Sequence, residues 1–396
     1  MSEFRTIREL CSVVVDCPHS TPKWTANGKI VIRNNNIKHG RIDFSSPSYT
    51  DDEHFAQRIK RAKPQPGDII ITREAPIGDV GMIPENTECC LGQRMVLLRA
   101  NQSVCDNFYL LYSLQSLYVQ HQISWSEGTG TTVSNLRIPH LEQIQIPYLP
   151  LEQQAKISSV LRALEEKIEN NRRLNDNLEQ QAQAIYHERF ETVSPNDLPS
   201  DWRIVTLGEV ATISNKSFNP LKEPEILLEH YSIPAFDEAR FPVFELSTSI
   251  KSNKFIIDAS CFMISKLNPT TKRVWKPYCL TGNAVCSTEF IVYKAKDQSI
   301  TDFLYSVIDS GSFSDFMCSH VTGSTGSRQR TTPSDTLSYE LILPSEDELA
   351  EFQSLVSPMY AQMRINAIEN DKLKRLRDSL LPKLMSGEID VSSVHL

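Results

Sequence analysis

Two stretches rich in Lys, Arg and Asn, one in each half of the chain, hold the side chains best suited to chemistry. The sequence between His19 and Lys63 has nine Lys or Arg residues against four acids, and the sequence between Lys251 and Lys276 has six against one. Lys and Arg neutralise phosphates, while Asn, Gln and Arg can form paired hydrogen bonds with base edges. Either stretch alone is more often a solvated surface, but their recurrence at matched positions favours nucleic-acid binding.

Twelve residues in and beside these stretches are the candidate DNA contacts. Arg and Lys would serve phosphate or guanine, and Asn would serve adenine. The candidates are Lys23, Arg33, Asn34, Asn35, Lys38, Arg41 and Arg73 in the first half, and Lys266, Lys272, Arg273, Arg328 and Arg330 in the second. Trp24 and Trp275 could stack on bases, with core packing as the more ordinary role.

Two loops rich in Gly, Ser and Thr, at residues 126–135 and 319–332, each lie directly before a long helical pattern. Their glycines and hydroxyl groups could approach a phosphate backbone closely. A plain connector explains them equally well, so both interpretations stay open.

No catalytic or metal-binding motif is present. The sequence lacks a G-x-x-x-x-G-K-[ST] phosphate loop, an H-E-x-x-H zinc motif and a G-x-S-x-G elbow. Residues 267–270 (LNPT) do not supply the Asn/Asp-Pro-Pro-Tyr/Phe motif of an adenine methyltransferase. The nine cysteines form no C-x-x-C pair, and the adjacent Cys89 and Cys90 suit neither a disulfide framework nor a zinc site. We therefore expect no catalytic residue, no bound metal and reduced, partly buried thiols.

Two long helical patterns must position the basic stretches. They fall into register when the sequence is shifted by 195 residues, and their apolar residues are alternately four and three apart. This spacing is the a/d pattern of a coiled coil. The predicted seam residues are Ile157, Leu161, Leu164, Ile168, Asn171, Asn175 and Leu178 in the first helix, and Phe352, Val356, Met359, Met363, Asn366, Asn370 and Leu373 in the second.

Both helices place Asn at the same two seam positions, which matches Asn171 with Asn366 and Asn175 with Asn370. A seam Asn lowers the stability of an apolar interface but is satisfied by another polar group, so it fixes register and partner. The matching suggests that the two helices pack against each other.

The second helical pattern has two irregularities. Arg377 interrupts its seam, and we expect the neighbouring Leu376 to take the inward place. Ser357 and Pro358 resemble an N-cap followed by a first-turn proline, which predicts a kink or a restart.

The 396 residues are too many for one ordinary core, so two or three domains are expected. The hydrophobic fraction of 40% and charged fraction of 23% are typical of a folded protein, and no stretch approaches the ~20 apolar residues of a membrane span. We expect a cytoplasmic α+β protein with domain boundaries at residues 1–150, 151–194, 195–344 and 345–396. The net charge of −8 argues against coating of nucleic acid by bulk charge and leaves local basic surfaces possible.

The order of domain, helix, domain and helix resembles a known family. Each half ends in a similar phrase, IPYLPLEQQ and LILPSEDEL; residues 198–210 (LPSDWRIVTLGEV) precede the second domain, and residues 376–391 (LRDSLLPKLMSGEIDV) close the pattern. Together these features resemble the specificity subunit of type I restriction-modification systems, over the whole chain.

The resemblance implies a non-catalytic DNA-binding subunit. Each globular half would be a target recognition domain that reads one part of a bipartite, asymmetric DNA site. The paired helices would form an antiparallel spacer that docks two methyltransferase subunits, with restriction and translocase subunits joining the larger complex. S-adenosylmethionine, ATP and Mg²⁺ would bind those partners, which would methylate adenine and cleave DNA.

Two other functions stay open at this point. A self-contained methyltransferase or nuclease would need the motifs that are missing. A coiled-coil adaptor that binds only proteins would explain the helices but not the two basic stretches.

Overall fold

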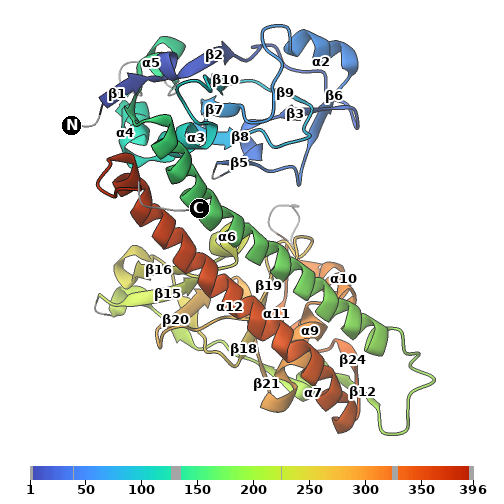
Figure 1. Cartoon of the computed structure of the whole chain (residues 1–396). Coiled ribbons are helices and arrows are strands. Elements are labelled where there is room, and N and C mark those ends of the chain that lie inside the picture. Colours follow the sequence, from blue (N-terminus) through green and yellow to red (C-terminus); the bar gives the residue numbers. More distant parts are fainter. Residues whose placement is uncertain (1–2, 39, 126–134, 224, 323–328, 392–396) are drawn as a thin grey trace. The chain divides into compact units, whose positions relative to one another are not determined.

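The computed structural model describes residues 3–38, 40–125, 135–223, 225–322 and 329–391. The chain forms two compact units, one of Met1–Lys167 with Leu373–Leu396 and one of Ile168–Lys372. Each unit contains one globular half and part of both long helices (Figure 1). The predicted domain boundaries stay a prediction.

The first unit is built around a four-stranded antiparallel sheet in the order β2-β10-β7-β8. The two central strands, β7 (Ile69–Arg73) and β10 (Met95–Ala100), are apolar runs with buried residues on both faces. The edge strands, β2 (Cys11–Asp16) and β8 (Ile77–Met82), are less buried. The chain reaches this sheet through β1 (Glu3–Thr6), which pairs with β11 (Gln145–Tyr148), and α1 (Ile7–Leu10). Thr6 and Glu9 form a capping box that starts α1.

A second sheet of the first unit has the order β6-β3-β9. Its strands β3 (Lys29–Ile32) and β9 (Cys89–Leu91) are parallel, and β6 (Ser48–Thr50) is antiparallel to β3. The remaining elements are η1 (Asn34–Asn36), the hairpin β4 (Ile37–Lys38) and β5 (Arg41–Ile42), α2 (Asp52–Arg58), α3 (Asn107–Gln115), α4 (Leu117–Trp125) and α5 (Ile138–Gln143).

The second unit repeats this topology. Its antiparallel sheet has the order β13-β21-β18-β19, and β12 pairs with β24. The short helix that follows β12 begins with another capping box, formed by Thr206 and Glu209. The bounds are β12 (Arg203–Thr206), α7 (Leu207–Val210), β13 (Ala211–Ile213), β18 (Cys261–Ser265), β19 (Val274–Trp275), β21 (Phe290–Ala295) and β24 (Glu340–Leu343). Strand for strand, this order matches that of the first unit.

The second sheet also recurs, enlarged to five strands in the order β14-β17-β20-β15-β16. Here β15 and β20 are the parallel pair. The strands are β14 (Ser217–Phe218), β15 (Leu227–Tyr231), β16 (Val243–Leu246), β17 (Lys254–Ile256) and β20 (Ala284–Ser287). The other elements are η3 (Pro220–Lys222), α8 (Ile233–Ala239), η4 (Ser247–Ser249), η5 (Gln298–Ile300), α9 (Thr301–Ile308), α10 (Gly311–Ser319), β22 (Val321–Thr322), β23 (Arg330–Thr331) and α11 (Pro333–Thr336).

The long helices are α6 (Leu151–Tyr186) and α12 (Glu346–Met385), and a π-helical turn, η2 (His187–Glu191), continues α6. In the first unit Ile157 and Leu161 share a core with Leu384 and Met385. In the second unit Ala182 and Tyr186 share a core with Phe352 and Val356. Early residues of one helix thus pack with late residues of the other in both units, so the predicted antiparallel pairing is confirmed.

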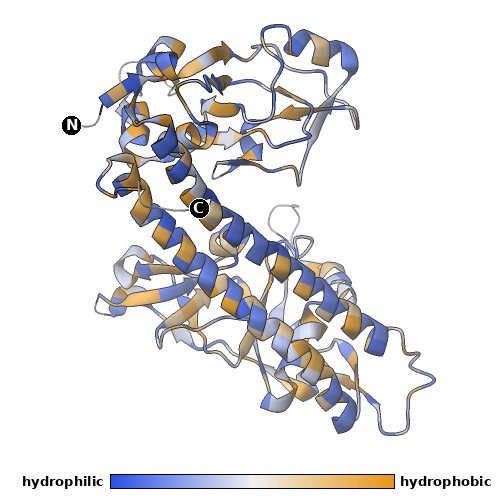
Figure 2. Ribbon diagram, viewed as in Figure 1, coloured by the Kyte–Doolittle hydropathy of each residue, from blue (hydrophilic) through white to orange (hydrophobic). Residues whose placement is uncertain are grey.

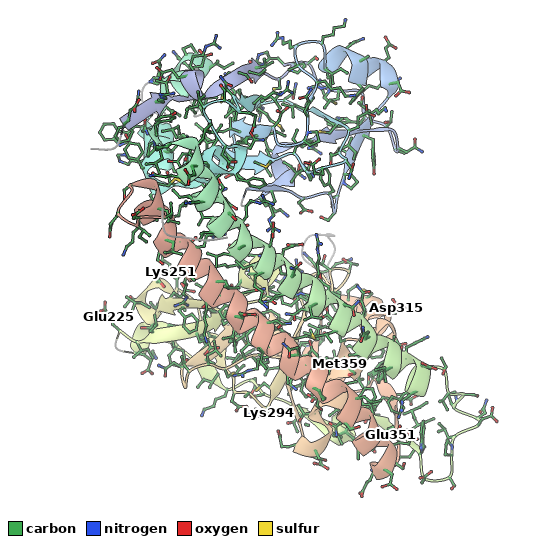
Figure 3. All side chains as sticks on the ribbon, in the orientation of Figure 1. Glu225, Lys251, Lys294, Asp315, Glu351 and Met359 are labelled. Atoms are coloured by element: carbon green, nitrogen blue, oxygen red, sulfur yellow. The ribbon has the colours of Figure 1, made fainter. Side chains whose placement is uncertain are left out.

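All fourteen predicted seam residues are buried or half-buried. Hydrophobic and hydrophilic residues alternate along both helices (Figure 2), as expected for helices with one buried stripe. Met359, which Figure 3 labels on α12, is one of the half-buried seam residues.

The seam asparagines form a hydrogen-bond network inside the second unit. Asn171 Nδ2 donates to Asn370 Oδ1 over 2.9 Å, and Asn366 Nδ2 donates to Asn175 Oδ1 over 2.8 Å. Asn370 Nδ2 donates to the backbone oxygen of Ile168, and Asn175 Nδ2 to that of Met363. The 195-residue shift relates Asn171 to Asn366 and Asn175 to Asn370, so it converts the Asn171–Asn370 bond into the Asn366–Asn175 bond. The network therefore has a local two-fold relation. The asparagines matched by the repeat occupy equivalent positions but do not bond to each other. The hydrogen-bonded partners are Asn171 with Asn370 and Asn366 with Asn175.

Two details of the second helix differ from the prediction. Leu376 is exposed, and Arg377 faces α6, where its Nη1 lies 2.6 Å from Glu165 Oε1. An ion pair therefore replaces the apolar contact that was expected from Leu376. The helix also continues through Ser357 and Pro358 without a restart, since one helix spans residues 346–385. Among the described residues, no helix combines the length and apolar character of a membrane span.

Candidate nucleic-acid interface

Three predicted DNA contacts follow directly after a parallel strand of the first unit. In the pair of β3 and β9, Ile32 lies opposite Leu91, so both strands end at the same edge. Residues 33–35 (Arg-Asn-Asn) leave this edge from β3, and residues 92–94 (Gly-Gln-Arg) leave it from β9. The carboxyl ends of neighbouring parallel strands are a common place for binding sites because polar loops converge there.

A cavity of about 580 Å³ lies at this edge. Trp24 is 46% exposed, and the guanidinium carbon of Arg33 is 5.2 Å from the centre of its ring. This geometry is a cation–π contact, which orients Arg33 while leaving its N–H groups available. The residues that line the cavity are Pro22, Trp24, Arg33, Asn34, Asn35, Ala75, Pro76, Gly92, Gln93 and Arg94.

Asparagine side chains fix the loop after β3. Asn36 is buried, and its Oδ1 accepts a hydrogen bond of 2.9 Å from the backbone N–H of Arg33. Asn34 Nδ2 donates to the backbone oxygen of Glu74 over 2.7 Å, whereas its buried Oδ1 has no partner among the described residues. Asn35 is exposed. The predicted run of three asparagines therefore combines one structural residue, one half-buried residue and one exposed residue.

Arg58, on α2, holds the backbone beside the cavity. This guanidinium is buried and donates to the backbone oxygens of Leu91 (2.7 Å), Gly92 (2.8 Å), Ser20 (2.9 Å) and Pro18 (3.2 Å). Burial lowers the pKa of Arg58 from its usual value. A buried cation bound only through these carbonyl groups adds positive potential beneath the cavity.

The corresponding edge of the second unit carries different side chains. Glu289, which follows β20, forms a two-pronged ion pair with Arg330 at 3.0 and 3.1 Å. Asp237, on the helix that follows β15, forms a similar pair with Arg273 at 2.6 and 2.9 Å. Lys266 is half-buried after β18. Acid-paired arginines thus lie near this edge, where the first unit has amides and a cation–π pair.

Lys272 is held by Asp309 in the second unit. Its Nζ lies 2.8 Å from Asp309 Oδ1 and donates to the backbone oxygen of the same residue over 2.7 Å. Burial raises the pKa of Asp309 to about 6, although the nearby ammonium group of Lys272 opposes the shift.

Four predicted residues of the first unit lie outside the cavity lining. Lys23 pairs with Asp51 at 3.3 Å, and Lys38 pairs with Asp43 at 2.7 Å. The hydrogen bond from Lys38 holds the pKa of Asp43 at about 2. The other two are Arg41 and Arg73.

Arg41 and Arg73 are anchored within the protein. Arg41 Nη2 donates to the backbone oxygen of Glu165 over 3.0 Å and lies 3.3 Å from its carboxylate. Arg73 is bound through all three guanidinium nitrogens, to Leu136, Asp16 and Asn135. These contacts favour structural roles, and direct DNA contact by either residue stays a prediction. Arg328 lies outside the described residues, as do residues 126–134 of the first Gly/Ser/Thr loop and residues 323–328 of the second.

The sequence interpretation missed Gln93 and Arg94. Arg94 has a φ of +65° and pairs with Glu74 at 3.2 Å, so its backbone turns sharply away from β9. The available signal was a polar Gly-Gln-Arg segment after the apolar Cys-Cys-Leu strand. Trp24 proves to be exposed, while Trp275 is buried in the second unit.

The two adjacent cysteines are core residues of β9. Cys89 and Cys90 are buried, and burial raises their thiol pKa values to about 12 and about 11. Such thiols are largely protonated and unreactive at neutral pH. In the part of the chain that the structure describes, no His, Cys, Asp or Glu residues cluster as metal ligands.

The chain is thus internally repeated, with an equivalent parallel-strand edge in each half and a long antiparallel helix pair. Residues 3–180 match the family described as the Type I restriction modification DNA specificity domain. Over these residues the chain is similar to the DNA specificity domain of type I restriction-modification systems, and several of the similar proteins carry the name specificity subunit. Members of this family are generally non-catalytic.

The proteins similar to this chain include type I specificity subunits. The specificity subunit of the type I restriction enzyme MjaIX from Methanocaldococcus jannaschii is 25% identical over 357 residues, covering 83% of this chain and 79% of the relative. The HindI specificity subunit of Haemophilus influenzae is 32% identical over 93 residues, or 24% of this chain and 20% of the relative. The crystal structure of the S subunit of a type I system from M. genitalium has the same fold, with a TM-score of 0.57 and 18% identity over 97% of this chain and 96% of the other.

Proposed function

We propose that this protein reads a bipartite, asymmetric DNA site, one half with each globular domain, and directs adenine methylation and restriction by partner subunits. The observation that carries the proposal is the repeated strand edge. The parallel pairs β3·β9 and β15·β20 occupy equivalent places in the two topologies, but their flanking side chains differ. Equivalent edges with different chemistry fit two different half-sites, since base identity is read by side-chain type.

The antiparallel helices would set the distance between the two half-sites. Their register is defined by the four-asparagine network and by the Arg377–Glu165 ion pair. A spacer of fixed register supports a fixed gap in the DNA site, as half-site spacing generally follows protein architecture.

The proposal assigns the chemistry to partners. Two methyltransferase subunits would dock on the chain, and restriction and translocase subunits would complete the assembly in the cytoplasm. S-adenosylmethionine, ATP and Mg²⁺ would bind these partners and not this chain. Relatives that carry the name specificity subunit support the assignment to a multisubunit enzyme.

The deciding experiment is co-expression of this chain with its neighbouring methyltransferase, followed by single-molecule sequencing of the host DNA. We expect methylated adenines in one split motif with a fixed gap, absent when this chain is omitted. A complex that assembles and retains methyltransferase activity but produces no new motif would overturn the proposal and favour a protein-binding adaptor.

A second measurement separates the adaptor directly. Binding of the assembled complex to duplex DNA should weaken steeply as salt rises, because each phosphate contact releases counterions. DNA binding that does not respond to salt would contradict a role for the basic residues.

A further inference from the structure

We propose that the cavity at the edge of β3 and β9 recognises a DNA base that carries an exocyclic amino group, and that Gln93 is the residue that reads it. The inference rests on the proposed function and assigns one specificity-determining side chain to the first half-site. Adenine N6 and cytosine N4 are the groups of this chemistry in the major groove.

The carboxamide of Gln93 is held in one orientation. Its Nε2 donates to the backbone oxygen of His19 and to Thr21 Oγ1, which lies 3.4 Å away. An amide nitrogen has two N–H groups, so both are directed toward the protein. The oxygen Oε1 accepts no hydrogen bond from the described residues, and Gln93 is half-buried in the cavity wall. Gln93 therefore offers an acceptor to the cavity.

Asn34 supplies a second acceptor in the same wall. Its Nδ2 is committed to the backbone oxygen of Glu74 at 2.7 Å, and its Oδ1 is buried without a partner among the described residues. Buried acceptors are nearly always paired in folded proteins. Because Oδ1 is covered in this structure, a bound amino group satisfies it only after the Asn34 side chain turns toward the cavity, whereas a ligand carbonyl oxygen would leave it unpaired in either position.

This pair of acceptors distinguishes the four bases. In the major groove, adenine and cytosine present an amino donor, whereas guanine and thymine present oxygen acceptors at the equivalent position. An acceptor against an acceptor would leave both groups unpaired in a partly buried site, which is unfavourable. The cavity should therefore favour adenine or cytosine at one position of the first half-site.

Neighbouring groups can hold the rest of the nucleotide. Arg33 lies over Trp24 and has no ion-pair partner among the described residues, so its guanidinium can bind the adjoining phosphate. Arg58 binds the backbone oxygens of Ser20 and Gly92, on either side of the hydrogen bond between His19 and Gln93. Arg58 is thus a positioning residue, and it reaches the base only through Gln93.

The test compares Gln93→Ala with Gln57→Ala in the assembled complex with the methyltransferase. Gln57 is an exposed glutamine on α2 that does not line the cavity, so it controls for residue type. Binding is measured to duplexes in which each base pair of the mapped site is replaced in turn. For the wild type, one position of one half-site should prefer adenine or cytosine by roughly 5- to 100-fold.

We expect Gln93→Ala to reduce this preference to within about threefold while leaving the other half-site unchanged, and Gln57→Ala to behave as the wild type. The inference would be overturned if Gln93→Ala kept the preference for adenine or cytosine. It would also be overturned if the position at which Gln93→Ala loses discrimination is one where the wild type prefers guanine or thymine. Gln93→Met keeps the length of the side chain but lacks the acceptor, and it replaces the alanine variant if that variant melts at a lower temperature. A wild-type complex with no split motif would instead contradict the proposed function, so the two failures are distinguishable.

Discussion

Asn171 on α6 and Asn370 on α12 are joined by a hydrogen bond of 2.9 Å, with both side chains buried in the helix seam. The local two-fold relation of the repeat generates a second bond, between Asn366 and Asn175. Each pair thus satisfies polar groups that would otherwise be buried among apolar neighbours. Because the bonded pairs exist in only one alignment of the helices, they define the register of the helix pair.

Changing one member of this pair should cost more than changing both. Asn171→Leu leaves Asn370 Oδ1 without its donor, and we expect a loss of about 1–3 kcal/mol in the free energy of unfolding. The double variant Asn171→Leu with Asn370→Leu should recover most of that loss, since two apolar residues can pack against each other. Urea denaturation of the four proteins in this double-mutant cycle measures the coupling.

The double variant should nevertheless loosen the register. We expect its complex to accept DNA sites whose gap differs by one base pair from the preferred length, while Asn170→Leu, an exposed neighbour, should keep the original preference. An unchanged gap preference in the double variant would show that other contacts, such as Arg377 with Glu165, suffice to set the register.

Asp309 predicts a specific dependence of stability on pH. Burial raises its pKa to about 6 in the folded protein, against about 3.9 for an unfolded Asp. The folded state therefore binds more protons between these values, so its stability falls as pH rises through this window. Above the folded pKa the Asp309 carboxylate is ionised in both the folded and the unfolded state. The full free-energy cost of burying the ionised carboxylate then lowers the stability of the folded state.

Replacing Asp309 by Asn should remove this penalty. The variant should gain stability relative to the wild type as pH rises from 5 to 8, by roughly 1–1.5 kcal/mol at 1.36 kcal/mol per pKa unit. The favourable effect of Lys272 is already contained in the pKa of Asp309, so Lys272→Met should enlarge the loss of stability between pH 5 and 8. Urea denaturation at the two pH values gives the difference, and a gain that shrinks toward pH 8 would contradict the raised pKa.

The helix seam could be predicted because its signal is local and repeated. The spacing of Ile157, Leu161, Phe352 and Val356 selects the buried stripe of each helix from sequence alone. The side on which Arg377 lies could not be predicted in this way, because it depends on Glu165, a partner 212 residues away.

The interface was harder to predict because it depends on non-local pairing and on side-chain partners. Gln93 joins Arg33 only through the parallel alignment of β9 with β3, which sequence periodicity does not reveal. Charge alone also failed to separate Arg33, which stacks on Trp24, from Arg73, whose guanidinium is occupied by protein groups. The composition of a basic stretch indicates a binding surface but not which cations remain available.

Arg58 should support the first half-site without contacting DNA. Arg58→Met removes hydrogen bonds to four backbone oxygens, and we expect a loss of at least about 2 kcal/mol in the free energy of unfolding. At a temperature where the variant stays folded, discrimination in the first half-site should weaken and that in the second should persist. Arg61→Met, an exposed neighbour of equal charge, is the control. Equal weakening of both half-sites would contradict a local positioning role.

Arg33 should contribute to affinity mainly through phosphate. Among the described residues its guanidinium has no ion-pair partner, so DNA binding breaks no existing bridge. We expect Arg33→Ala to weaken binding to all duplexes by a similar factor and to reduce the slope of log affinity against log salt by about one. Arg273→Ala should reduce the slope less, because Arg273 must first leave its two-pronged bond with Asp237. If Arg33→Ala instead weakens binding only where one particular guanine is present, Arg33 reads that base and the phosphate assignment is wrong.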